Sequence, residues 1–195
     1  MAKVEDDLII LDAQADVYAC LFARADQVAL AGDGVIAAPA DLEAALLEAG
    51  FIQTTAPAGL RKSPTPPARS TSAPSSSLTA VLVGVAECGC DALVFRSRAL
   101  HQLVQPPRLH PRPAADAAVI AADFAAALPW APANGACLQR AFQLRRRLAR
   151  RGVAVDWVFG VRTWPFSAHC WLQIDDRVIG DRLERVSAYT PIAAF

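Results

Sequence analysis

The sequence predicts an α+β protein made of three successive segments. Residues 1–53 hold two short apolar runs followed by a helical pattern, and residues 78–195 hold three helical patterns followed by apolar residues at a spacing of two. The intervening residues 54–77 are rich in Pro, Ser and Thr. Helices that precede a run of strands are typical of an α+β domain, in which the helices pack on an antiparallel sheet.

The first segment is expected to fold as a small unit of strands and a helix. Leu8–Leu11 and Val17–Leu21 indicate two strands, which the acidic turn Asp12–Asp16 joins. Asp41–Ala49 has helical spacing and ends at Gly50, a residue that commonly stops a helix. A unit of about fifty residues has a marginal core, and this one lacks histidine, so it suits binding better than chemistry.

The second segment, residues 54–77, is predicted to be an extended, mobile tether. It is dominated by Pro, Ser and Thr and holds too few apolar residues to bury a core of its own.

The third segment is predicted to begin with three helices. The first runs from Leu78 to about Val104, the second over residues 114–128 and the third from Cys137 to near Gly152. The first is apolar enough to raise the question of a membrane span. Because it contains Glu87 and Asp91, we expect a buried helix and no membrane span.

Three strands are predicted after these helices, over residues 153–161, 167–174 and 177–181. Trp164-Pro165 and Asp175-Asp176 mark the turns between them. The helices would then lie on an antiparallel sheet.

The charge of the chain is zero overall but divided along its length. Residues 1–53 hold 2 basic and 10 acidic residues, a net charge of −8, whereas residues 78–195 hold 14 Arg and 9 acidic residues, a net charge of +5. Opposite charges on two units indicate either mutual steering or separate partners, and an ordinary solvated surface explains them equally well.

The cysteines indicate a reducing compartment. Their number is odd, no C-x-x-C pair occurs, and the acidic start of the chain does not resemble a secretory signal. We therefore expect a cytoplasmic protein without a disulfide framework. The five are Cys20, Cys88, Cys90, Cys137 and Cys170.

Cys137 is the candidate nucleophile because it opens the third predicted helix. Free N–H groups and the positive dipole end at a helix start stabilise a thiolate and lower the pKa of the sulfur. The same groups can hold the oxyanion that develops during acyl transfer. A small buried cysteine is the alternative interpretation, since Cys137 shares an inward face with Ala141, Leu144 and Leu148.

His169 and Asp181 are the candidates for the base and for the group that orients it. His169 shares a strand face with Ser167 and Trp171, whereas Cys170 points the other way and is assigned to the core. A two-residue loop at Asp175-Asp176 would turn Asp181 away from His169. The catalytic interpretation therefore predicts a three-residue loop or a bulge.

Other candidate sites are weaker. Cys88-Gly89-Cys90 with His101 lacks the spacing of common zinc sites, so no metal is expected. The arginines of Arg140–Arg151 are spread around the helix, which indicates a solvated face and no nucleic-acid partner. No glycine-rich phosphate loop is present in the sequence.

Four motifs follow one another in residues 137–181, and together they resemble the B protein of lasso-peptide biosynthesis, whose peptidase domain is a transglutaminase-like thiol protease. They are Cys137-Leu138-Gln139-Arg140-Ala141, Val158–Arg162, Phe166–Leu172 and Val178–Asp181. Leu11-Asp12 and Asp16-Val17-Tyr18 resemble the small winged-helix-like recognition element of peptide-modifying systems. Two residues depart from the pattern: Cys170 stands where Ala is common, and Gly180 where Asn is frequent.

This resemblance implies a fused leader peptidase without a cofactor, in which residues 78–195 form a transglutaminase-like or papain-like cysteine protease domain. Residues 1–53 would bind the leader of a ribosomally made precursor as an added strand along Val17, Tyr18, Ala19 and Cys20. Cys137, His169 and Asp181 would cleave the leader. A partner, the asparagine-synthetase-like, ATP-dependent lasso cyclase, would then close the core. Trp130 would line the acyl pocket or sit in the core.

Two functions of other classes remain open from the sequence. One is a non-catalytic scaffold that binds the precursor or the cyclase, with Cys137 as a packing residue. The other is acyl transfer to an amine, which the wider superfamily permits.

Overall fold

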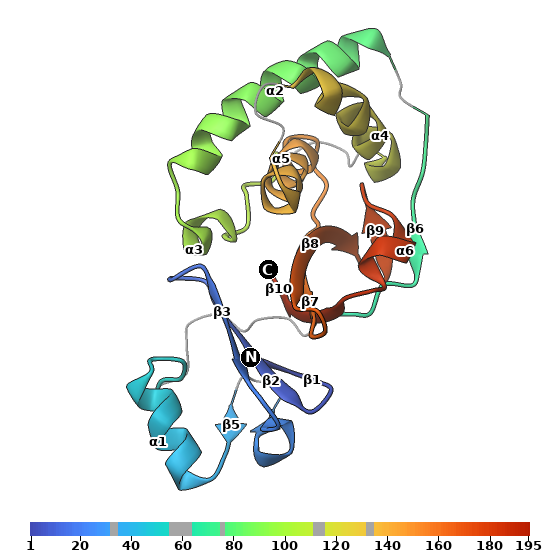
Figure 1. Cartoon of the computed structure of the whole chain (residues 1–195). Coiled ribbons are helices and arrows are strands. Elements are labelled where there is room, and N and C mark those ends of the chain that lie inside the picture. The colour runs from blue at the N-terminus through green and yellow to red at the C-terminus, as the bar shows by residue number, and fades with distance from the viewer. Residues whose placement is uncertain (32–34, 55–63, 75–76, 111–115, 132–134) are drawn as a thin grey trace.

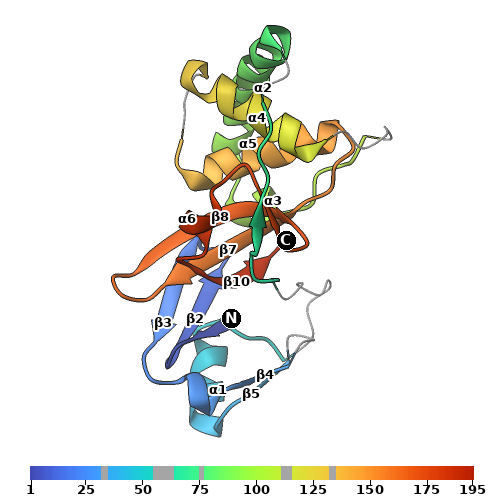
Figure 2. The same ribbon diagram turned by 90° about the vertical axis from the view of Figure 1, so that its right-hand side faces the viewer.

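The computed structural model describes residues 1–31, 35–54, 64–74, 77–110, 116–131 and 135–195. Figures 1 and 2 show three tiers: helices at one end, the larger sheet in the middle, and a smaller N-terminal sheet with its own helix at the other end. The α+β architecture predicted from the sequence is therefore present in the fold.

The N-terminal unit is a three-stranded antiparallel sheet in the order β1-β2-β3, followed by a two-stranded ribbon and one helix. Its elements are β1 (Ala2–Val4), β2 (Asp7–Asp12), β3 (Val17–Leu21), the 3-10 turn η1 (Ala25–Gln27), β4 (Ala29–Leu30), β5 (Ile36–Ala37) and α1 (Ala40–Glu48). The two predicted strands and the helix lie where the sequence placed them. The Asp12 carboxylate accepts the N–H groups of Gln14 at 2.8 Å and Ala15 at 3.2 Å, which explains the turn between β2 and β3.

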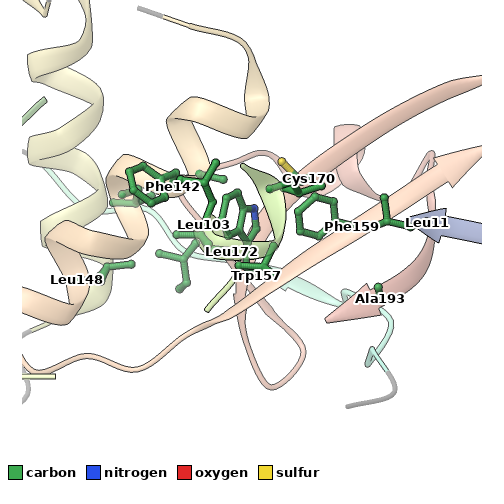
Figure 3. Close-up of a cluster of buried hydrophobic side chains, with 14 of the residues drawn as sticks. Leu11, Leu103, Phe142, Leu148, Trp157, Phe159, Cys170, Leu172 and Ala193 are labelled. Carbon is green, nitrogen blue, oxygen red and sulfur yellow. The ribbon is translucent and has the colours of Figure 1, made fainter. Parts of the chain in front are cut away.

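Strand β2 is buried on both faces. Leu8 and Ile10 pack with Leu42 and Leu46 of α1, in a small core of the N-terminal unit. Ile9 and Leu11 point the other way and join the large core of the C-terminal half. Figure 3 shows Leu11 beside Phe159 in this shared core.

The C-terminal half contains five helices, one 3-10 turn and the larger sheet among the described residues. The helices are α2 (Leu78–Arg96), α3 (Leu100–Leu103), α4 (Ala117–Ala127), α5 (Cys137–Arg150) and α6 (Leu183–Val186), and the turn η2 (Leu128–Trp130) follows α4. The sheet order is β10-β7-β8-β9-β6, with β6 (Arg69–Ser70), β7 (Asp156–Arg162), β8 (Ser167–Ile174), β9 (Arg177–Ile179) and β10 (Thr190–Ala194).

The sequence reading missed two strands of this sheet, β6 and β10. The other three lie close to their predicted positions, and β7–β8–β9 pair antiparallel as expected. β10 pairs antiparallel with β7 on one side, whereas β6 pairs parallel with β9 on the other.

The predicted mobile tether differs from the structure in the part that is described. Arg69 pairs with Arg177 in β9, and its guanidinium forms an ion pair with Asp176 at 2.9 Å. The amide of Gln173 donates to the Thr65 carbonyl at 2.8 Å. This stretch is therefore held on the sheet, because the short strand β9 leaves an edge that needs backbone partners. Residues 55–63 and 75–76 of the predicted tether lie outside the described residues.

The prediction that residues 78–104 form one buried helix is wrong in two respects. The helix breaks between α2 and α3, and the outer face of α2 is exposed, with Leu78, Leu82 and Leu93 at 74%, 61% and 69%. By length and composition alone α2 could cross a membrane. Of its apolar 18-residue stretch, 22% is buried inside the protein. Its acidic residues instead face α5.

The prediction of a solvated arginine face on α5 is also wrong. Arg145 and Arg147 are 3% and 2% exposed. Arg147 forms an ion pair with Glu87 of α2 at 2.7 Å, and Arg145 donates to the Phe195 carbonyl at 2.9 Å. The fully buried Asp91 binds Arg146 at 2.7 Å and also Arg150. These arginines hold α5 between α2 and the sheet.

Candidate active site

A cavity of about 350 Å³ opens at the uncovered part of strand β8. Within β8, only Leu172, Gln173 and Ile174 pair with β9, so the preceding part of β8 is left open on that side in the described structure. Helix α5 begins at this opening, and Cys137, His169, Cys170 and Asp181 are among the residues that line the cavity.

Cys137 is the first residue of α5, and the preceding residue, Ala136, has no side chain that could cap the helix. Its sulfur is hydrogen-bonded to the Cys170 thiol and to His169, and it also receives the backbone N–H of Cys170. These hydrogen bonds, with Cys170 contributing most, outweigh burial and lower the pKa of Cys137 to about 4. The sulfur is therefore a thiolate at neutral pH.

His169 lies on β8 and contacts both other candidate groups. Its Nε2 is 2.7 Å from Asp181 Oδ2, and Cys137 is its second hydrogen-bond partner. Burial lowers the pKa of His169, but the hydrogen bonds to Asp181 and Cys137 outweigh it and raise the pKa to about 9. The ring is held between those of Trp171 at 6.1 Å and Tyr189 at 5.2 Å. At neutral pH the site thus holds a thiolate–imidazolium pair.

Asp181 reaches His169 by a route that the sequence analysis did not foresee. Ile174 pairs with Arg177, so the β8–β9 loop has two residues and the predicted three-residue loop is wrong. That register would place Asp181 opposite Cys170 and away from His169. Pairing ends at Ile179, however, and Gly180 adopts a left-handed conformation with φ of +76°. The chain turns there and directs Asp181 back to the imidazole.

The Asp181 carboxylate is held by three donors. Oδ2 meets His169, while Oδ1 accepts the Arg182 N–H at 2.8 Å and lies 3.7 Å from the Arg185 guanidinium. Burial would raise the pKa of Asp181, but these contacts, with His169 contributing most, lower it. A second hollow of about 400 Å³ adjoins the first, and the two hollows share Gly180, Asp181 and Arg185 in their walls.

The prediction that Cys170 is only a core residue is wrong. The side chain is buried, at 4% exposed, and belongs to the large core shown in Figure 3. Its thiol nevertheless reaches the Cys137 sulfur. Strand alternation places Cys170 and His169 on opposite faces of the sheet. Because Cys137 at the start of α5 lies at the open edge of β8, both side chains still reach its sulfur.

Arg185 and Tyr189 were also missed. No sequence motif marks them. Arg185 lies in α6 and Tyr189 in the turn between α6 and β10, and this segment folds back over the cavity, a contact that local sequence does not predict.

The residues predicted to bind substrate fall into two groups. Val17, Tyr18, Ala19 and Cys20 lie on β3, which pairs only with β2 among the described strands and so has an open edge. Trp130 is 74% exposed and is absent from the described lining of the cavity, so it is neither a core residue nor a wall of the site in this structure.

Within the described residues, no cluster of three or more His, Cys, Asp or Glu side chains could hold a metal ion.

Residues 80–194 match the transglutaminase-like superfamily, whose members are typically cysteine proteases or acyltransferases. The match covers more than half of the chain, so the chain belongs to the transglutaminase-like superfamily.

A segment of 45 residues is 40% identical to the microcin J25-processing protein McjB of Escherichia coli, and it spans 23% of this chain and 22% of that protein. This chain is therefore matched to only a small part of its relative. No solved structure matches the chain significantly.

Proposed function

We propose that this protein is a leader peptidase of lasso-peptide maturation. It would bind the leader of a ribosomally synthesised precursor and remove it by thiol proteolysis. The observation that carries the proposal is the chain of contacts from Cys137 through His169 to Asp181, with the Nε2–Oδ2 distance at 2.7 Å. Similarity to a microcin-processing protein supports the substrate class.

Cleavage would begin with attack of the Cys137 thiolate on the carbonyl carbon at the leader–core junction. N–H groups at the start of α5 would stabilise the oxyanion. The His169 imidazolium would protonate the leaving amine through Nδ1, because Nε2 is bound to Asp181. The core would depart with a free N-terminus. Water, activated by the now neutral His169, would hydrolyse the thioester and release the leader.

The leader would bind as a fourth strand on the open edge of β3. Backbone hydrogen bonds supply affinity in this mode, and side-chain pockets supply specificity. The Val17 end of β3 is the end near the active site, because Tyr18 lies close enough to Cys170 and Cys137 for their charges to add to burial in raising its pKa. The leader would therefore run antiparallel to β3, so that its C-terminal part leaves at Val17 towards Cys137. That residues 1–53 act as a winged-helix-like recognition element is part of this proposal.

The partner would be an asparagine-synthetase-like lasso cyclase that joins the freed core N-terminus to an acidic side chain. The proposed chemistry of the peptidase needs only protein groups and water. A cytoplasmic location, where Cys137 stays reduced, is part of the same proposal.

Incubating a lasso-peptide precursor that carries its leader with the wild type and with Cys137→Ala tests the activity, with the products followed by mass. We expect the leader mass to appear only with the wild type. Cys90→Ala is a matched control, because Cys90 is an exposed cysteine of α2, far along the chain from the site. Equal turnover by Cys137→Ala would end the nucleophile assignment. Binding without cleavage by the wild type would favour a scaffold, and a product that carries an added amine would favour acyl transfer.

A further inference from the structure

The turn between β7 and β8 presents two aromatic side chains to solvent. Trp164 is 77% exposed and Phe166 is 50% exposed. The turn is nevertheless held against the N-terminal unit at two points. The Phe166 ring meets the Tyr18 ring edge-on at 5.8 Å, and the Thr163 hydroxyl donates to the Glu5 carboxylate at 2.8 Å. Tyr18, Trp164 and Phe166 are called the hairpin surface below.

The hairpin surface lies between the open edge of β3 and the cavity at Cys137. Tyr18 belongs to β3, and it packs on the same core as Cys137 and Cys170. Phe166 directly precedes β8, in which Ala168 and Cys170 follow on the same face by strand alternation. A peptide that leaves β3 at its Val17 end and extends to Cys137 therefore crosses these aromatic rings.

The chemistry of the hairpin surface favours a large apolar side chain. None of its three members is charged. Two carboxylates lie nearby: Glu5 is bound by Thr163, and Asp16, next to Val17, adds a small contribution to the raised pKa of Tyr18. The Arg162 guanidinium lies over the Tyr189 ring at 5.9 Å, and that ring also contacts the His169 imidazole. Aromatic side chains have few rotatable bonds, so they supply contact area at a low entropic cost and are frequent binding hot spots.

We propose that the hairpin surface binds a large apolar side chain of the precursor, located between the segment paired with β3 and the scissile bond. The proposal rests on the peptidase function proposed above. It assigns Trp164 and Phe166 as specificity-determining residues outside the cavity. Their contact would keep the part of the leader nearest the cut from moving freely, and so would raise the concentration of the scissile bond at Cys137.

Binding is measured on the Cys137→Ala protein, from the anisotropy of a fluorescein-labelled lasso-peptide precursor that carries its leader. We expect Trp164→Ala and Phe166→Ala each to weaken binding about tenfold, which corresponds to about 1.4 kcal/mol. Phe166→Leu should recover most of the loss. The matched control is Leu93→Ala, which removes a 69% exposed apolar side chain from the outer face of α2 and should change Kd less than twofold.

An alanine scan of the peptide locates the partner side chain. One apolar position should reproduce the tenfold loss, and combining it with Phe166→Ala should cause little further loss, because the two changes remove the same contact. Unchanged Kd for Phe166→Ala, or losses that add at every peptide position, would overturn the proposal.

Two measurements separate this proposal from others. In proteins that keep Cys137, a short peptide that spans only the cut should be cleaved equally well by the wild type and by Phe166→Ala. An equal loss on that peptide would mean that Phe166 merely supports the site, and would overturn a role in specificity. The anisotropy experiment needs no cleavage, so a wild type that binds without cutting refutes the peptidase while the variants still decide the role of the hairpin surface.

Discussion

Asp181 favours the charged form of His169. Burial lowers the pKa of His169, but the hydrogen bonds to Asp181 and Cys137 raise it to about 9, so the imidazolium is present at neutral pH and is lost as the pH rises through that value. Activity should therefore form a bell, rising as the Cys137 thiolate forms near pH 4 and falling near pH 9. In Asp181→Asn the neutral amide still accepts from Nε2 but no longer favours the cation. The basic limb of kcat/KM against pH should move to lower pH.

Asp181→Ala is the companion variant, because it also removes the acceptor that orients the ring. We expect it to show the same shift of the basic limb and to lose about 100-fold in kcat at the optimum. A profile of Asp181→Asn that overlays that of the wild type would show that the carboxylate does not set the charge of His169.

Cys170 stabilises the thiolate. Its hydrogen bonds are the largest influence that lowers the Cys137 pKa, and the thiol donates one of them. Cys170→Ala keeps the backbone N–H but removes this thiol donor. A hydrogen bond to a charged group contributes about 1.5–3 kcal/mol, so the Cys137 pKa should rise by roughly one unit or more.

The rate of iodoacetamide alkylation against pH reports this pKa without any substrate. Cys88→Ala is the control, because Cys88 is a buried thiol of α2 whose own pKa burial raises to about 11. It should leave the alkylation midpoint unchanged. An unchanged midpoint in Cys170→Ala would show that the backbone and His169 suffice.

Residue types and their order selected Cys137, His169 and Asp181 as candidates, and the structure brings these three side chains into contact. The role of Cys170 was hidden. Strand alternation places its side chain opposite that of His169, and sequence does not reveal that α5 approaches the edge of β8 rather than one face.

At the scale of elements, Gly180 brings the site together. Its φ of +76° is a conformation that L side chains rarely adopt, and an added Cβ would press on the Leu144 side chain. Gly180→Ala should cost about 2–4 kcal/mol of unfolding free energy, from the backbone conformation and the overlap together. It should also reduce cleavage, because Asp181 would no longer face His169.

Gly50→Ala is the matched control for Gly180→Ala. Gly50 also has a left-handed conformation, with φ of +72°, but no atom lies within 4 Å of the added Cβ. We expect a cost of about 1–2 kcal/mol and unchanged cleavage. Urea midpoints and cleavage rates of both variants test this comparison. Gly180→Ala with normal activity would refute the role of the turn.

The register of β8 and β9 shows why elements are harder to predict than residues. Counting from Asp175-Asp176 correctly predicts where Asp181 would lie if the strand continued. The strand predicted over residues 177–181 was too long, because pairing stops at Ile179. A glycine directly before the aspartate was the available signal, since glycine allows the chain to turn where other residues do not.

At the scale of the molecule, the two halves share a core that the sequence analysis divided. The apolar run Leu8-Ile9-Ile10-Leu11 contained the signal, because a strand without alternation is buried on both faces. Pairing of β6 with β9 and of β10 with β7 joins residues far apart in sequence, and only tertiary packing selects those partners.

Two adjacent residues of β2 separate the contributions of the two cores. Leu11 and Ile10 are each 4% exposed, but Leu11 packs in the core shared with Phe159, whereas Ile10 packs against α1. Either change to alanine should cost about 2–5 kcal/mol. The location of the loss should differ. Leu11→Ala should reduce hydrogen-exchange protection in β7 and β10 as well as in β2, whereas Ile10→Ala should reduce it in β2 and α1.

Leu11→Ala should also slow cleavage, because the shared core positions β8 through Phe159, which pairs with Cys170. Ile10→Ala should instead weaken leader binding on β3 more than it affects cleavage of a short peptide that spans only the cut. Protection of β7 and β10 that stays the same in Leu11→Ala would show that the halves behave as separate units. The leader would then reach Cys137 only by tethering, and the packing of β2 on the sheet would contribute nothing to its placement.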